Sequence, residues 1–165
     1  MTLDDKPITR GREDLMRRAA ALSAEKMRSG LGGPFGCVIA RDGQIIAEGS
    51  NEVTSANDPT AHAEVVAIRE ACRKLGTFNL EGCELYTSCE PCPMCLGAIY
   101  WARLDRVYYA NTRTEAAAIG FDDDHIYREL DKAINDRAVP FIRMASAEAQ
   151  QAFREWAEKP DKTRY

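Results

Sequence analysis

Helical periodicity covers two long segments in the first half of the chain. In residues 12–29 and 61–75 the apolar side chains recur three and four positions apart, which is the spacing of one face of an α-helix. The residues on these faces are Leu15, Ala19, Leu22, Val65, Ile68, Cys72 and Leu75. Gly30 is a typical stop after the first segment. Both segments are therefore predicted to be amphipathic helices.

Shorter runs typical of β-strands lie between and after these helices. Phe35–Ala40 and Gln44–Glu48 are separated by Arg41-Asp42-Gly43, and Asp-Gly between two such runs predicts an antiparallel hairpin. Further strands are predicted at 84–88, 106–111 and 139–144, and further helices at 92–103, 114–119, 124–130 and 147–158. This alternation, without a repeat or an interior linker, predicts one α/β domain over residues 1–165.

The amino-acid composition bears on where the protein resides in the cell and on which partners it could bind. The chain has 22 basic and 26 acidic residues and a net charge of −4, and no run of Lys or Arg offers a surface for a phosphate backbone. We therefore expect no nucleic-acid partner. The polar opening, Met1–Arg12, lacks the apolar core of a secretory signal, and no segment resembles a membrane span. These features predict a cytoplasmic protein without disulfides.

Three potential metal ligands and one carboxylate stand out. His62-Ala63-Glu64 is followed by a Cys-x-x-Cys pair at Cys92 and Cys95. A histidine and two thiolates can occupy three corners of a tetrahedral zinc, and catalytic zinc sites keep the fourth corner for water. Glu64 would stay unligated and could carry protons to and from that water. We therefore predict one zinc per chain, held by His62, Cys92 and Cys95, with Glu64 as the catalytic residue.

A structural zinc site is the alternative reading of these residues. Cys89 lies three positions before Cys92, so it could close the site as a fourth ligand in a non-catalytic binding module. That arrangement would leave Glu64 without a role, which favours the open site. The other cysteines are expected to be buried as small apolar residues: Cys37, Cys72 and Cys83.

Both ligand groups fall in the first turn of a predicted helix. His62 opens the helix that ends near Leu75, and the Cys92/Cys95 pair opens the next one. The unpaired N–H groups and the positive dipole end of such a turn favour anions. Two helix starts facing one metal would therefore help to keep both cysteines as thiolates.

The sequence around these ligands resembles the cytidine deaminase-like superfamily. The resemblance rests on Pro59–Glu64 and Thr87–Arg103, which together match the H-x-E…P-C-x-x-C signature of nucleobase deaminases. Gly32-Gly33-Pro34-Phe35-Gly36 and Gly120-Phe121-Asp122-Asp123 make the chain most similar to the bacterial guanine deaminases, from about residue 12 to the end. This resemblance implies a three-layer α/β/α fold with a central mixed sheet of five strands. It also implies a homodimer that exchanges a C-terminal segment, with an arm over about residues 159–165.

The same resemblance implies a purine site. Asn51 corresponds to a purine-binding asparagine, Asp123 to an aspartate near the amine-bearing edge, and Tyr165 to a terminal tyrosine that closes the pocket. Asp122 and Asp124 flank Asp123, so either could take its place. Two further substrate-binding candidates are Phe35, whose ring could stack on a base, and Ala63 of the histidine motif.

Together these features predict the zinc-dependent hydrolysis of guanine to xanthine and ammonia. The ring N–H and the exocyclic amine of guanine are donors, which suits a carboxylate such as Asp123, whereas the Asn51 amide can both donate and accept. Deaminases of guanosine, cytosine or a related heterocycle are the alternatives. A deaminase of adenosine in transfer RNA is disfavoured by the acidic charge, because phosphate binding calls for Lys and Arg.

Overall fold

The computed structural model describes residues 10–165, so most of the polar opening segment lies outside the described residues. The chain forms two compact units, one that ends at Asp123 and one that spans Asp124–Tyr165. The described helices include none that is long and apolar enough to cross a membrane. Each unit is described by itself below.

The first unit is built around a mixed sheet of four strands in the order β2-β1-β3-β4. Its strands are β1 (Gly36–Arg41), β2 (Gln44–Ser50), β3 (Glu84–Cys89) and β4 (Arg106–Asn111). β1 pairs antiparallel with β2 and β3, and β3 pairs parallel with β4 through the crossover that contains α4 (Pro93–Trp101). The central strands β1 and β3 are buried on both faces, and β1 is correspondingly apolar over Cys37–Ala40, whereas β3 also buries Thr87 and Ser88.

The predicted hairpin is confirmed. Only Asp42 and Gly43 connect β1 to β2, and their φ angles of 50° and 77° are both positive. A two-residue loop of this kind matches the right-handed twist of the paired strands, and glycine adopts it without a steric cost. This turn, together with a shift of register between Ile39 and Ala40, leaves Ser50 opposite Gly36, and Asn51 follows beside Phe35.

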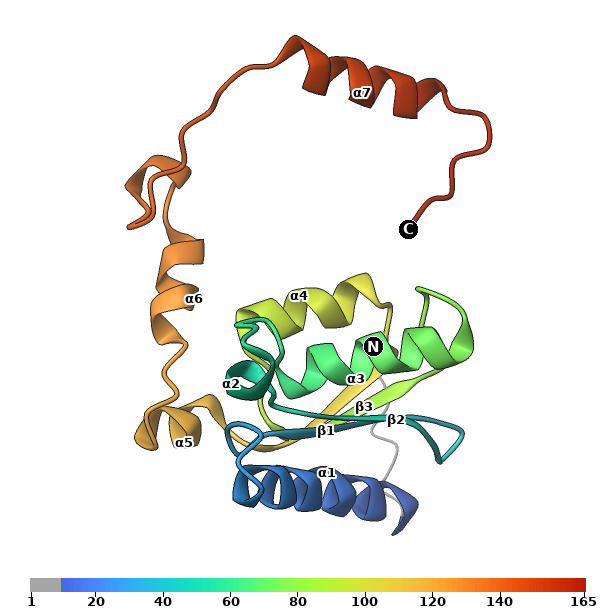
Figure 1. The fold of residues 1–165 in the computed structure, drawn as a ribbon, viewed down its shortest axis with the longest axis vertical. Coiled ribbons are helices and arrows are strands. Elements are labelled where there is room, and N and C mark those ends of the chain that lie inside the picture. Colours follow the sequence, from blue (N-terminus) through green and yellow to red (C-terminus); the bar gives the residue numbers. More distant parts are fainter. Residues whose placement is uncertain (1–9) are drawn as a thin grey trace, which may run out of the picture. The chain divides into compact units, whose positions relative to one another are not determined.

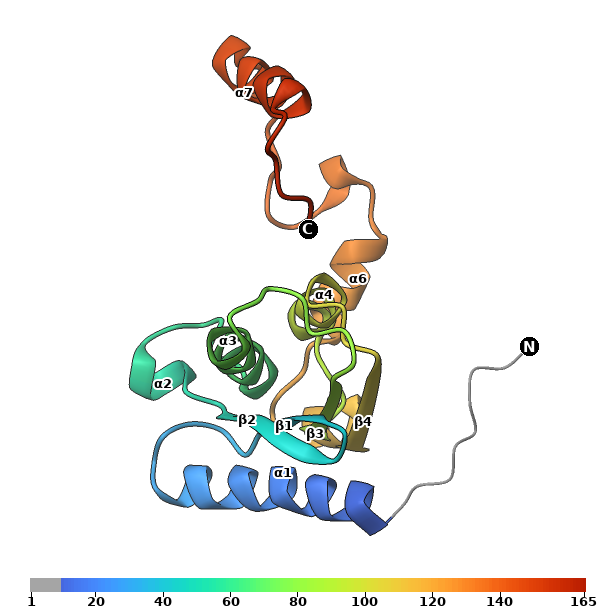
Figure 2. The same ribbon diagram turned by 90° about the vertical axis from the view of Figure 1, so that its right-hand side faces the viewer.

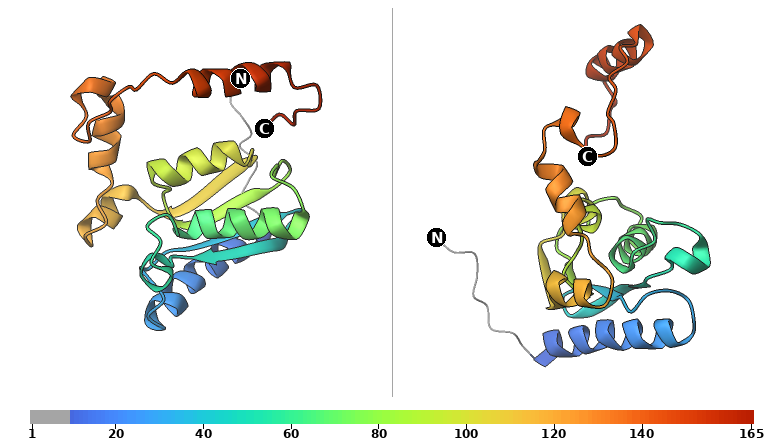
Figure 3. Two further views of the ribbon diagram at one scale, coloured as in Figure 1. Left: turned by 45° about the horizontal axis from the view of Figure 1, so that its top comes forward. Right: turned by 90° about the vertical axis from the view of Figure 1, so that its left-hand side faces the viewer.

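Helices cover both faces of this sheet (Figures 1 and 2). Helix α1 (Arg10–Arg28) packs on one face, while α3 (Ala63–Leu75) and α4 pack on the other. Two glycines permit the close approach. A Cβ at Gly36 would lie 2.3 Å from the carbonyl oxygen of Ala19, and one at Gly49 would lie 2.2 Å from that of Ala63. The first unit is therefore the predicted three-layer α/β/α arrangement (Figure 3).

Two short elements complete the first unit. Helix α2 (Val53–Ala56) follows Asn51 and was not expected from the sequence. Helix α5 (Arg113–Ala118) starts at a capping box, in which Thr112 and Glu115 bond to each other's backbone N–H groups.

The second unit contains α6 (Asp124–Asp131), a 3₁₀ turn at Ile134–Asp136 and α7 (Ala147–Glu158). The strand predicted at 139–144 is not formed, so the sheet has four strands within the described residues and the prediction of five was wrong. The run Val139-Pro140-Phe141-Ile142 has strand-like composition, but a strand also needs a partner for its backbone groups, and this segment pairs with none.

Candidate active site

The predicted zinc ligands lie where two helices begin. His62 is the N-cap of α3, Cys92 is the N-cap of α4, and Cys95 lies in the first turn of α4. Neither N-cap side chain bonds to the backbone of its own helix. Both side chains are therefore free to serve as ligands, and the N–H groups of the two first turns favour negative charge on the sulfurs.

The spacing of these three residues fits a zinc ion. Their ligand atoms all lie within 4.8 Å of one another, and the two sulfurs are 3.5 Å (Cys92) and 3.6 Å (Cys95) from Nδ1 of His62. Zinc–nitrogen and zinc–sulfur bonds of about 2.05 and 2.3 Å at a tetrahedral angle would separate such atoms by about 3.6 Å. One nitrogen and two sulfurs at this separation leave the fourth corner without a protein ligand.

Cys89 does not belong to this group. Its Sγ contacts the carbonyl oxygen of Thr112 at 3.9 Å, and burial raises the pKa of its thiol to about 11, so it stays protonated near neutral pH. Among the described residues the cluster therefore has three ligands, and the closed four-ligand alternative does not match the geometry.

The two ligand cysteines have different proton affinities. Hydrogen bonds with Cys95 and His62 lower the pKa of Cys92 to about 4, despite its partial burial. The same bond to Cys92, together with burial, raises the pKa of Cys95, while the bond to Cys92 raises the pKa of His62. Cys92 is thus a thiolate at neutral pH, and a divalent cation would compete with the proton on Cys95.

Glu64 lies against this cluster in the first turn of α3. It is buried, and its Oε2 is 3.3 Å from Sγ of Cys95, while its Oε1 accepts a hydrogen bond of 3.0 Å from the Thr87 hydroxyl. Burial raises the pKa of Glu64 above its usual value. A carboxyl group of raised proton affinity beside an open metal position has the properties of a general acid and base.

Asn51 is held in one orientation at the end of β2. Its Oδ1 accepts bonds of 3.3 Å from the backbone N–H groups of Gly33 and Val53. The side-chain NH₂ makes no hydrogen bond with any described residue, so the amide presents a donor, whereas the sequence argument allowed it both roles. Gly32 packs directly against it, and a Cβ at Gly32 would lie 2.1 Å from the Asn51 carbonyl oxygen.

Phe35 belongs to an aromatic pair. Its ring meets the ring of Phe121 edge to face, with 4.8 Å between the centroids, and its carbonyl oxygen accepts from the N–H of Asn51 at 3.1 Å. Gly33 lies under both rings, since a Cβ there would come within about 3.2 Å of each. The two glycine-containing motifs singled out in the sequence are thus brought together by Phe35 and Phe121.

The three aspartates at positions 122–124 lie in different environments. Asp124 forms an ion pair with Arg128 inside α6, and Asp122 is exposed. Asp123 is half-buried, and burial followed by the charge of Cys92 raises its pKa. The negative charge of Cys92 thus acts on Asp123.

The last two candidates differ in kind. The side chain of Ala63 is fully buried in the core cluster between the sheet and α3, so its contribution to binding remains a prediction. Tyr165 lies in the second unit and is 67% exposed, and its role also remains a prediction.

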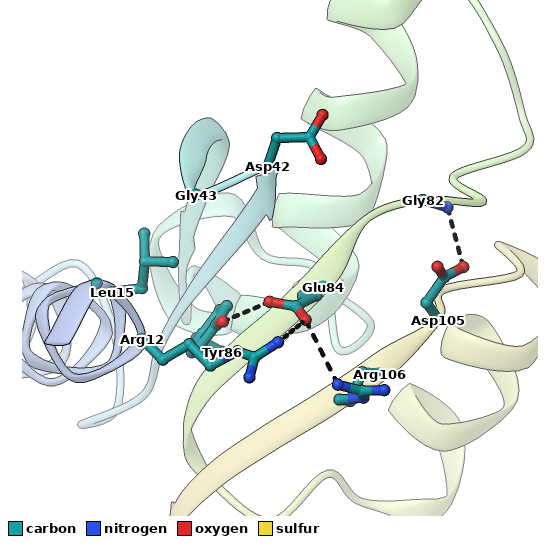
Figure 4. Close-up of a pocket in the computed structure, with 10 residues that line it drawn as sticks. Arg12, Leu15, Asp42, Gly43, Gly82, Glu84, Tyr86, Asp105 and Arg106 are labelled. Atoms are coloured by element: carbon teal, nitrogen blue, oxygen red, sulfur yellow. Dashed lines mark hydrogen bonds and ion pairs between the residues drawn. The ribbon is translucent and has the colours of Figure 1, made fainter. Parts of the chain in front are cut away.

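A separate pocket lies at the opposite end of β3 (Figure 4). It is lined by Arg12, Glu84, Tyr86 and Arg106, among others, and Figure 4 shows these side chains converging on the Glu84 carboxylate. Arg12 and the Tyr86 hydroxyl donate to Glu84 at 2.8 and 2.6 Å, and these bonds lower the pKa of Glu84 in spite of burial. The cluster ties α1 to β3 and β4 and does not contain the reactive groups predicted from the sequence.

Comparison with known proteins agrees with this geometry. The family model of the cytidine and deoxycytidylate deaminase zinc-binding region matches residues 9–111. The chain belongs to this deaminase family. It is 54% identical to the guanine deaminase of Bacillus subtilis over 153 residues, which covers 93% of this chain and 98% of the relative. The crystal structure of that deaminase superposes with a TM-score of 0.90 over the same shares of the two chains.

More distant deaminases share the fold. A guanine deaminase from Nitrosomonas europaea is 35% identical, with a TM-score of 0.64 over 67% of this chain and 64% of that one. A transfer RNA adenosine deaminase from Streptococcus pyogenes is 34% identical over 79% of this chain and 75% of the relative. The zinc-binding deaminase domain is thus common to proteins that act on different substrates.

Two residues of the site were not singled out as functional from the sequence. Thr87 appeared only as part of the strand before the cysteines, where threonine is an ordinary β-former. Phe121 was noted in a motif but given no role. The alternation of side chains along β3 could have placed Thr87 on the face of Leu85, but its partner Glu64 could be identified only from the fold.

Proposed function

We propose that this protein hydrolyses guanine to xanthine and ammonia. The observation that carries the proposal is the three-ligand cluster with the buried carboxylate of Glu64 at its edge, 3.3 Å from Cys95. The 54% identity to the Bacillus subtilis guanine deaminase, over nearly the whole of both chains, supports the choice of substrate.

His62, Cys92 and Cys95 would hold the zinc. When bound there, zinc supplies a Lewis acid that makes water nucleophilic near neutral pH. Oε2 of Glu64, 3.3 Å from Cys95 Sγ, would take a proton from the attacking water, pass it to the purine ring nitrogen and deliver a proton to the leaving amine. The bond from carbon 2 to the water oxygen would form first, with the ring nitrogen taking a proton, and the carbon-2–amine bond would break afterwards, so one guanine and one water give xanthine and ammonia.

Other residues of the first unit would recognise the base. The NH₂ group of Asn51, with its oxygen already occupied, would donate to an acceptor on the purine. Asp123 would accept from the N–H and amine donors at the reacting edge. The Phe35 and Phe121 pair offers aromatic surface beside Asn51 for packing against the ring.

We also propose that the protein is a homodimer with exchanged C-terminal segments, working as one enzyme domain despite its two units. The second unit exposes large apolar side chains that a packed partner would cover: Ile142 at 83%, Met144 at 87% and Phe153 at 83%. On the first unit, Leu96 and Tyr100 of α4 are also exposed. In such a dimer Tyr165 would close the purine pocket.

The expected cytoplasmic location remains a prediction from the sequence.

A substrate panel tests the proposed function. The zinc-loaded protein is incubated with guanine, guanosine, cytosine, cytidine, adenine and transfer RNA, and ammonia is measured. We expect guanine to be the best substrate. Ammonia from guanosine or transfer RNA but not from guanine would refute the assignment, and a folded zinc protein without any turnover would indicate a structural zinc module.

A further inference from the structure

Thr87 is a polar residue among apolar ones at the centre of the sheet. It alternates with Leu85 on the face of β3 that packs toward α3 and lies opposite Cys37 of β1, and all three side chains are buried. A buried hydroxyl without a hydrogen-bond partner is destabilising. The partner of Thr87 is the carboxylate of Glu64.

This hydrogen bond distinguishes the two oxygens of Glu64. The Thr87 hydroxyl donates to Oε1 at 3.0 Å, whereas Oε2 lies 3.3 Å from the sulfur of Cys95. A carboxyl group protonated on Oε2 still has an acceptor at Oε1, so the bond from Thr87 can persist in both protonation states. The hydroxyl can therefore hold the carboxyl group in place while a proton comes and goes.

We propose that Thr87 is a positioning residue that directs proton transfer to Oε2 of Glu64. Thr87 holds Oε1, the oxygen that does not contact Cys95, and so restricts rotation of the carboxylate away from the ligands. The inference rests on the proposed function for the reaction itself, but the hydrogen bond and the orientation it enforces can be tested without it.

The position of Thr87 in the fold suits this role. Strand β3 is paired on both sides, with Thr87 opposite Cys37 of β1 and Tyr109 of β4, so its backbone is fixed by two ladders. Glu64, in contrast, lies in the first turn of α3, where the N-cap His62 provides no side-chain bond to the helix. A rigid strand thus supports a group on a helix end, and small displacements of such groups can lower rates about 100-fold.

Replacement of the hydroxyl by a methyl group is the direct test. Thr87→Val keeps the shape of the side chain and removes the donor. We expect kcat to fall about 10- to 100-fold, which corresponds to the loss of a hydrogen bond to a charged group. KM should change by less than about threefold and zinc content should stay near one per chain, because neither ligands nor base contacts are altered. Thr87→Ser should restore most of the rate.

Ser88 provides the matched control. It is the next residue of β3, is also buried, and its hydroxyl accepts from the Gly36 N–H at 3.0 Å without contacting Glu64. Ser88→Ala should lower the melting temperature as much as Thr87→Val or more, yet leave kcat within about twofold, since a buried N–H loses its acceptor but Glu64 keeps its donor. An equal loss of kcat in both variants would mean that Thr87 is merely structural.

A double-mutant cycle decides whether Thr87 acts through Glu64. In a Glu64→Gln background, which has no carboxylate to position, Thr87→Val should lower kcat by less than about twofold. The same 10- to 100-fold loss in both backgrounds would overturn the proposal. Unchanged kcat in Thr87→Val alone would overturn it as well.

A structural measurement separates this inference from the proposed function. Crystal structures of zinc-loaded wild type and Thr87→Val should show the Glu64 carboxylate rotated or disordered only in the variant. If wild type releases no ammonia from guanine, the proposed function fails, and the Glu64 conformation still tests the positioning role. An identical Glu64 conformation in the two structures would refute that role whatever the substrate.

Discussion

Glu64 combines burial with a contact to the sulfur of Cys95. Burial raises the pKa of Glu64 above its usual value, and a raised proton affinity suits a carboxyl group that must both accept and return a proton. The same environment makes the residue sensitive to changes that preserve its shape.

Glu64→Gln should therefore separate folding from catalysis. The amide retains the size of the side chain and an oxygen that can accept from Thr87, but it cannot carry the proton. We expect kcat to fall about 10²- to 10⁴-fold, with zinc content and melting temperature close to wild type. Steady-state ammonia release and metal analysis measure the two effects, and near-normal turnover would show that another group handles the proton.

Gly32→Ala should act on recognition of the base. The added Cβ would lie 2.1 Å from the Asn51 carbonyl oxygen and 2.6 Å from its Oδ1, so the amide must shift. We expect kcat/KM for guanine to fall about tenfold or more, roughly the effect of one misplaced hydrogen bond. Gly11→Ala is the control, because nothing lies within 4 Å of its Cβ position, and its kinetics should match wild type.

The sequence best predicted those site residues whose chemical type and spacing along the chain both match a known kind of site. The residue types and spacing of His62, Cys92 and Cys95 indicated a zinc site, and the structure brings these three together. The orientation of the Asn51 amide depends on backbone N–H groups at Gly33 and Val53, which come from separate turns of the chain. The bond from Val53, two positions along the chain, is of the local kind typical of Asn, whereas Gly33 lies 18 positions away, and a contact at that separation leaves no local pattern from which it could be predicted.

At the scale of elements, the sequence best predicted those helices and turns whose stabilising contacts lie within the element itself. The helices and the hairpin have caps, turns and periodicity in their own sequences, and α7 (Ala147–Glu158) was predicted with the observed bounds. The strand β4 (Arg106–Asn111) was also predicted with its observed bounds, and it forms because β3 is there to pair with it. The run 139–144 has the composition of a strand but no ladder in the described chain. Strand formation depends on a partner elsewhere, and composition does not report whether one is present.

The contact between α1 and β2 predicts a pH-dependent stability. Arg18 bonds both oxygens of Glu48, at 2.7 and 2.8 Å, and these bonds lower the pKa of Glu48 below its usual 4.5. A lowered folded-state pKa means that the stabilisation is complete above the unfolded-state pKa and is lost as the pH falls through the folded-state value. The partial exposure of both side chains limits it to about 0.5–1 kcal/mol.

Glu48→Gln should therefore be less stable than wild type at pH 7 by about that amount, and the difference should shrink as the pH falls below about 4.5 and vanish below the lowered folded-state pKa of Glu48. Urea unfolding of both proteins across this range measures it. Glu25→Gln serves as the comparison, since Glu25 contacts Arg18 at only 3.3–3.4 Å on the surface and should contribute less. A difference that persists unchanged in acid would mean that the ion pair is not its source.

At the scale of the whole molecule, the second unit offers many apolar side chains and no core of its own among the described residues. None of the residues of α6 or α7 is buried. A unit of about 40 residues is below the size at which a single core usually sustains itself. Burial of these side chains against a partner would stabilise the unit, and this supports the proposed exchange.

Complementation can test that exchange. A protein lacking Lys162–Tyr165 and the Glu64→Gln protein should each be nearly inactive, the first because Tyr165 no longer closes the pocket. If Tyr165 acts across subunits, mixed dimers contain one site with both residues intact, and co-refolding should restore up to about a quarter of wild-type activity, the statistical share of such sites. Full activity of the truncated protein would show that the tail is dispensable, and no recovery on mixing would place it in its own subunit.

The N-caps of α3 and α4 make no side-chain bond to their own helices, and this should affect how easily the first turn of each helix opens. In most helices a polar side chain at this position bonds to an amide of the first turn, but His62 and Cys92 leave that bond unmade. A zinc ion coordinated by both residues would then hold the two helix starts together. Chelation should speed amide hydrogen exchange in the first turns of α3 and α4 well before it affects the capped start of α5. Hydrogen exchange measured by mass spectrometry would show whether zinc holds the two helix starts together.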